Sequence, residues 1–243
     1  MVEPGDGDGR CLAVAPVLRS DTILRFRTVL RVNVHVTSYS RDVNLPATPV
    51  GEPSPEELRF IFRSDRLCLA FCATVGERWR RGFERLPAPA DLARWYAEAG
   101  VADVPVPVNR ADLNGARAVR EAVYRLARAR VGGRAPAPGD EDVVNRAVAA
   151  PPPVPRMSRG VVTLTAAGPD QAASALSAVA RDAVALFTTA DAGRLRECAS
   201  PECGLLFLDL SRPGRRRWCS SDACGGKARA AAYRQRRVRA AAD

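Results

Sequence analysis

The spacing of apolar residues along the chain predicts a mostly helical protein with a few short strands. Between residues 85 and 190, apolar side chains recur every three or four positions in segments bounded by proline or glycine. This spacing places them on one face of a helix that packs on a common core. We predict helices over residues 89–100, 112–130, 140–150 and 170–190, and one strand in the β-branched segment 161–166.

The predicted helix 112–130 shows this pattern most clearly. Its apolar stripe consists of Leu113, Ala116, Val119, Val123 and Leu126. Four arginines lie off the stripe and are expected in solvent: Arg117, Arg120, Arg125 and Arg128.

Residues 1–55 are predicted to be a separable extension. The segment from Ile23 to Val36 alternates between apolar and polar residues and could form one or two strands, and a proline-rich segment follows it at residues 45–57. The extension carries no motif with assignable chemistry. It is therefore interpreted as a linker, a disordered segment or the product of a start codon upstream of the natural one.

Composition excludes several classes of protein. The 243 residues are 47% hydrophobic, which is enough for a core, and charged or proline residues interrupt every apolar run before it could span a membrane. The first residues do not form an export signal, so we predict a cytoplasmic protein. The single histidine, His35, and the lack of an assembled nucleophile, base and orienting group indicate that the protein is not an enzyme.

Positive charge is concentrated at the end of the chain. The formal net charge is +10, and the segment from Arg194 onward holds 12 basic residues against five acidic ones. Such asymmetry is typical of a segment that binds a polyanion.

Four of the seven cysteines form two closely spaced pairs. Cys198 and Cys203 are separated by four residues, as are Cys219 and Cys224, and fifteen residues lie between the pairs. In a reducing compartment this spacing favours a tetrahedral zinc site over disulfides, and four thiolates leave no open position, so one structural zinc is predicted. The alternative is four buried thiols. Cys68 and Cys72 lack further ligands nearby and are expected in the core.

The residues between the pairs predict a small finger. Leu205–Leu210 is strand-like, the Pro213-Gly214 dipeptide marks a turn, and Arg215–Trp218 could return as the second strand of a hairpin. A helix is then expected to begin near Cys224. Knuckle, hairpin and helix in this order are similar to a treble-clef finger, in which we expect Trp218 to cover the metal.

The segment SRPGRRRWCSSDACG, with the four cysteines around it, resembles the CGNR zinc-finger family, and the region from LRFIFRSDRLCLAFCATVGERW to DAVALF is similar to the ABATE domain of the same family. The resemblance implies a DNA-binding transcriptional regulator whose N-terminal domain senses a small-molecule effector, and a location at the nucleoid. Two motifs depart from the family. Cys224-Gly225-Gly226-Lys227 stands where the family has Cys-Gly-Asn-Arg, and Leu69-Ala70-Phe71 lacks the usual Asp.

The predicted fold class is therefore mainly α with small β elements. An α-rich domain at residues 57–190 precedes a treble-clef-like zinc finger at residues 191–243. We expect these two parts to fold independently, so that loss of the metal leaves the helical domain intact.

Guanidinium groups suit phosphate oxygens and guanine edges, so the basic side chains of the finger are candidates for nucleic-acid contacts. The candidates are Arg212, Arg215, Arg216, Arg217, Lys227, Arg229, Arg234, Arg236 and Arg237. Two other interpretations stay open: a solvated basic tail, and a zinc-stabilised module that binds protein or RNA without reading DNA sequence. Nothing in the sequence determines the oligomeric state.

Overall fold

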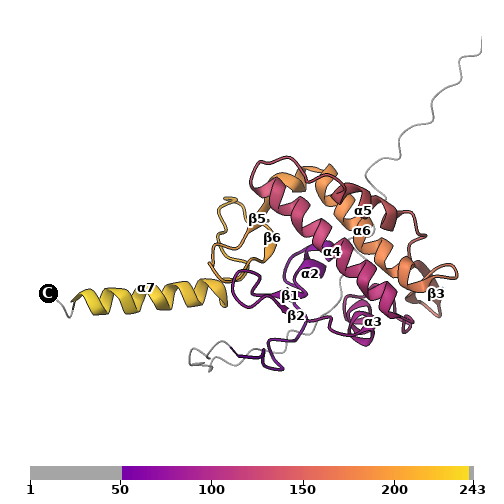
Figure 1. The fold of residues 1–243 in the computed structure, drawn as a ribbon, viewed down its shortest axis with the longest axis horizontal. Helices are drawn as coiled ribbons and strands as arrows, with labels where there is room; N and C mark the ends of the chain where they lie inside the picture. Colours follow the sequence, from indigo (N-terminus) through magenta and orange to yellow (C-terminus); the bar gives the residue numbers. More distant parts are fainter. Residues whose placement is uncertain (1–50, 241–243) are drawn as a thin grey trace, which may run out of the picture. The chain divides into compact units, whose positions relative to one another are not determined.

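The computed structural model describes residues 51–240 (Figure 1). Most of the predicted extension, including the alternating segment from Ile23 to Val36, lies outside the described residues. Within residues 51–240, no helix combines the length and apolar character needed to cross a membrane.

Helices dominate the described part of the chain, as the sequence predicts. The helices are α2 (Leu67–Cys72), α3 (Pro89–Glu98), α4 (Arg110–Val131), α5 (Asp140–Val148), α6 (Gln171–Thr188) and α7 (Cys224–Ala240), with a short 3-10 helix, η1 (Ala190–Arg194). The strands are β1 (Val75–Gly76), β2 (Phe83–Glu84), β3 (Val154–Ser158), β4 (Val161–Thr165), β5 (Leu195–Glu197) and β6 (Leu206–Leu208). They form three two-stranded antiparallel sheets, β1-β2, β3-β4 and β5-β6.

Local capping signals define the ends of the longest helix, α4. The Asn109 side chain accepts hydrogen bonds from the backbone N–H of Ala111 at 2.7 Å and of Asp112 at 3.0 Å. Asp112 in turn accepts from the Asn109 N–H at 2.8 Å, which completes a capping box. The helix ends at Gly132, where the following Gly133 adopts a positive φ.

The core forms where α2 packs between longer helices. α2 contacts α4 and α6, and its residues from Cys68 to Cys72 are all buried. Trp95 of α3 packs on Phe71 with ring centroids 4.7 Å apart. Cys68 and Cys72 are core thiols, as predicted, and burial raises the pKa of Cys72 to about 12, so this thiol stays protonated.

The predicted strand at residues 161–166 is β4, and its partner β3 arises from a segment whose prolines obscured it. Pro155 has no N–H to donate, which is compatible with a strand at the edge of a sheet. Asp103 holds the base of this hairpin: its backbone N–H donates to the Leu164 carbonyl at 2.9 Å and its carboxylate accepts from the Leu164 N–H.

Candidate metal centre and its basic surroundings

The two cysteine pairs, Cys198 with Cys203 and Cys219 with Cys224, form one cluster. Their sulfur atoms all lie within 4.8 Å of one another. The Cys203 and Cys219 sulfurs are 3.8 Å apart, and those of Cys219 and Cys224 are 3.6 Å apart. A tetrahedral zinc with bonds of about 2.3 Å holds its sulfur ligands roughly 3.8 Å apart, so the donor set and its geometry fit this metal.

Each cysteine is placed by the end of a structural element. Cys198 follows β5 directly, Cys203 lies in the turn that leads to β6, and Cys224 is the first residue of α7. Cys219 precedes the α7 cap, where the Ala223 N–H donates to the Ser220 hydroxyl at 3.1 Å. The Cys219 N–H in turn approaches the Cys198 sulfur at 3.5 Å, a contact that stabilises a thiolate.

The predicted pairing of Leu205–Leu210 with Arg215–Trp218 is wrong. β6 instead pairs with the preceding strand β5, in a register that places Phe207 opposite Arg196. The returning segment is held as a loop by Asp209, whose carboxylate accepts from the Ser211 N–H at 3.1 Å and from the Arg216 N–H at 2.8 Å. The knuckle between Cys198 and Cys203 is therefore the connection of the hairpin.

Successive side chains of β6 enter two different cores. Leu206 and Leu208 belong to the core of the helical domain, together with Leu195 of β5. Phe207, between them, packs with Cys198 and Cys219 in the core of the finger, and Trp218 covers this cluster as predicted. Because neighbouring strand residues face opposite sides, one short strand joins the two cores.

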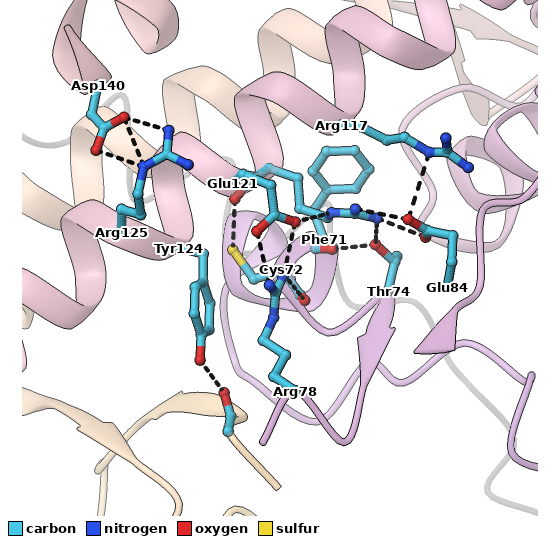
Figure 2. A network of polar contacts seen from close by, with 12 residues as sticks. Phe71, Cys72, Thr74, Arg78, Glu84, Arg117, Glu121, Tyr124, Arg125 and Asp140 are labelled. Carbon is cyan, nitrogen blue, oxygen red and sulfur yellow. Dashed lines mark hydrogen bonds and ion pairs between the residues drawn. The ribbon is translucent and has the colours of Figure 1, made fainter. Parts of the chain in front are cut away.

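The helical domain also holds the finger by polar contacts (Figure 2). The Tyr124 hydroxyl of α4 donates to the Gly204 carbonyl at 3.0 Å, and the Arg78 guanidinium lies 3.8 Å from the centre of the Tyr124 ring. The indole N–H of Trp79, in the loop between β1 and β2, donates to Glu197 at 2.8 Å.

Sequence reasoning missed a buried charge network beside these contacts. Arg120, expected in solvent, is only 4% exposed. Its guanidinium forms two bonds with Glu84, at 2.7 and 2.8 Å, and one with Glu121 at 2.8 Å. Glu121 also accepts two hydrogen bonds from the Arg78 guanidinium, with N–O distances of 2.8 and 3.1 Å (Figure 2). Opposing effects act on the pKa of Glu121: burial raises it, but the arginines outweigh burial and lower it.

Arg216, a candidate nucleic-acid contact, instead lies against the cysteine cluster. Its guanidinium donates to the Trp218 carbonyl at 2.9 Å and to the Cys219 carbonyl, and it lies 4.6 Å from the centre of the Phe207 ring. Arg216 therefore covers the cysteine cluster and supplies positive charge next to it.

The other eight candidate basic residues are all exposed, and they come from the loop before Cys219 and from α7. They are Arg212, Arg215, Arg217, Lys227, Arg229, Arg234, Arg236 and Arg237. Arg217 lies 5.3 Å from the Trp218 ring centre, and Arg229 donates to the Ser221 carbonyl at 3.1 Å. The side chains of the other six have no hydrogen-bond or ion-pair partner within residues 51–240, and α7 contains no acidic residue.

The fold thus combines a helical domain with a finger that carries four clustered thiols. Comparison with known families finds the same two parts in the same order. The family model ABATE, described as "Putative stress-induced transcription regulator", matches residues 65–190, and the CGNR zinc finger matches residues 194–237. The chain belongs to the ABATE family and contains a CGNR zinc finger. Among curated proteins, none matches the chain. With the finger and the clustered thiols, its cofactor is one structural zinc ion.

Proposed function

We propose that the protein is a DNA-binding transcriptional regulator whose zinc finger binds duplex DNA through a basic loop and a basic helix. The observation that carries this proposal is the set of exposed, mostly unpaired basic side chains next to the cysteine cluster. A polyanion would neutralise these charges and release its own counterions, which favours binding.

In this proposal Cys198, Cys203, Cys219 and Cys224 ligate the zinc. Four thiolates would fill its coordination sphere, so the metal's part is to order the loop and the start of α7. The site would carry a formal charge of −2, and Arg216, whose guanidinium contacts the Cys219 carbonyl, lies where it compensates this charge. An enzymatic role has no support from such a closed site.

We further propose that residues 57–190 form the sensing domain and residues 191–243 the DNA-binding domain, and that the protein acts at the nucleoid. A surface groove of about 440 Å³ lies among α4, α5 and α6. Its lining includes the apolar side chains of Val144 and Phe187. Two arginines, Arg130 and Arg134, also line it against one acid, Glu141, and this net positive charge suits a small anionic effector. Because α6 leads through η1 into β5, a ligand in this groove could act on the finger.

The test is binding of the full chain to duplex DNA and to RNA of equal length, at several salt concentrations. Neutralising about four to six phosphates predicts that log affinity falls with log salt with a slope of about −4 to −5. A matched control is the double variant Arg156→Ala and Arg159→Ala, which removes two exposed charges from the β3-β4 hairpin and should leave the slope unchanged.

Three outcomes would count against the proposal. Equal or tighter binding to RNA would favour an RNA-binding module. Absence of binding to either nucleic acid would leave the finger as a protein-binding module or a solvated surface. A smaller slope in the control variant than in the wild-type chain would show that total charge, and not the finger, determines binding.

A further inference from the structure

The side chains of α7 are distributed unevenly around the helix. Successive residues of an α-helix are about 100° apart, so Lys227 and Arg234 lie on one flank, and Arg229 and Arg236 lie on another, about 200° further round the helix. Between these flanks is an arc of about 100° that carries small or amide side chains and one arginine. Its members are Ala228, Ala231, Ala232, Gln235 and Arg239.

This arc lies on the same side of α7 as the metal centre. Cys224 belongs to the arc by helical position, and its sulfur lies 3.6 Å from that of Cys219. The loop that carries Arg212, Arg215 and Arg217 leads into Cys219. The exposed basic side chains of the loop and the arc of α7 are therefore both connected directly to the cysteine cluster.

Two side chains in the arc can read bases. The side chains of Gln235 and Arg239 are exposed and have no hydrogen-bond or ion-pair partner among the residues that the structure describes. A glutamine amide can make two hydrogen bonds to adenine in the major groove, and a guanidinium can do the same to guanine. The alanines leave room for the helix to approach base edges, and their methyl groups can contact a thymine methyl.

We propose that α7 lies in the major groove of duplex DNA, with Gln235 reading an adenine and Arg239 a guanine, while the flanking basic residues bind the two phosphate backbones. This inference rests on the proposed function. Gln235 and Arg239 are four residues apart, which is about 6 Å along the helix. Base pairs rise about 3.4 Å each, so the two preferred bases should be about two steps apart.

Selection of bound duplexes from a random library by the full chain tests the proposal. We expect two preferred positions, an adenine and a guanine about two steps apart. Gln235→Ala should remove the preference for adenine alone, and Arg239→Ala that for guanine alone. Each change should weaken binding to the preferred site about 5- to 150-fold and alter binding to random duplex less than twofold. Gln235→Glu should shift the preference toward cytosine, whose amino group a carboxylate accepts.

Arg236→Ala is the matched control on the flank. It should weaken the preferred site and random duplex by similar factors, because a phosphate contact carries no sequence information. Alanine is a strong helix former, so circular dichroism should show α7 retained in every alanine variant. If the chain binds duplex DNA but Gln235→Ala and Arg239→Ala leave the selected sequence unchanged, this inference fails and the proposed function stands. Absence of DNA binding by the wild-type chain overturns both.

Discussion

The hydroxyl of Tyr124 donates a hydrogen bond of 3.0 Å to the carbonyl oxygen of Gly204 and so joins the longest helix of the helical domain to the turn between Cys203 and β6. Gly204 has a φ of +64°, and a Cβ at this position would lie 2.9 Å from both the Arg78 Cβ and the Trp79 Nε1. The finger and the helical domain are thus in contact through backbone as well as side chains.

Gly204→Ala should therefore be strongly destabilising. The left-handed conformation and the contact with Arg78 together should cost about 2–4 kcal/mol of unfolding free energy, measured by chemical denaturation. Gly214→Ala is the control, since Gly214 also has a positive φ, of +61°, but nothing lies within 4 Å of its Cβ position. It should cost only about 1–2 kcal/mol. Equal losses in the two variants would show that the close approach of the helical domain is unimportant.

The shared core leads to a second prediction, which replaces the expectation that the two parts fold independently. Leu195, Leu206 and Leu208 pack in the helical core, so disorder of the finger removes part of that core. Cys219→Ser, or removal of the metal by a chelator, should lower the melting temperature of the helical domain by roughly 5–10 °C. The measurement is a thermal scan of near-ultraviolet circular dichroism, which reports the buried Trp95 and Tyr96. An unchanged transition would mean that the two parts fold separately.

The limits of the long helices could be predicted because their signals are local. Asn109 and Asp112 start α4, and Pro151 follows α5, whatever the rest of the chain does. The strand partner of Leu206–Leu208 could not be predicted in this way. It depends on competition between β5, which is three residues long, and a return segment that Asp209 holds as a loop.

Which arginines are buried could not be predicted from the sequence either. The four thiols could be predicted to share one cluster, since two closely spaced pairs with a loop between them are typical of a metal site in a reducing compartment. Arg120 and Arg216 look like their exposed neighbours in the sequence. Arg120 is buried by its bonds to Glu84, and Arg216 is half-buried by its bonds to the Trp218 and Cys219 carbonyls, and these partners come close only in the folded chain.

Substitution of Arg120 provides a third prediction. Arg120→Met should cost about 1–3 kcal/mol, because it removes the buried partner that Glu84 and Glu121 share, while Arg117 and Arg78 stay in place. Arg120→Lys should restore little, since an ammonium group cannot make the two parallel bonds to Glu84. As a control, Arg94→Ala removes an exposed pair with Glu98 and should cost less than about 1 kcal/mol. Chemical denaturation gives the unfolding free energy of each of the three variants. If Arg120→Lys is as stable as the wild-type chain, the two parallel bonds to Glu84 do not contribute to stability.

Stability should also depend on the ionisation of Glu57. A hydrogen bond from Arg81 lowers the pKa of this carboxyl from 4.5 to about 2. The unfolded chain therefore binds the proton more readily, so the stabilisation is present above pH 4.5 and is lost as the pH falls toward 2. Glu57→Gln should reduce the slope of unfolding free energy against pH in this range. Glu52→Gln, at an exposed position, should not, and equal slopes for the two variants would contradict the role of Arg81.

The last prediction separates the arginines that serve the metal from those proposed to serve DNA. Arg216 contacts the Trp218 and Cys219 carbonyls, whereas Arg215 is exposed and has no partner among residues 51–240. Arg216→Ala should accelerate loss of zinc to a colorimetric chelator several-fold, because it removes charge compensation and cover from the cluster. Arg215→Ala should leave zinc release unchanged and reduce the magnitude of the salt slope of DNA binding by about 0.9. If zinc leaves both variants at the wild-type rate, the position of Arg216 over the cluster has no part in holding the metal.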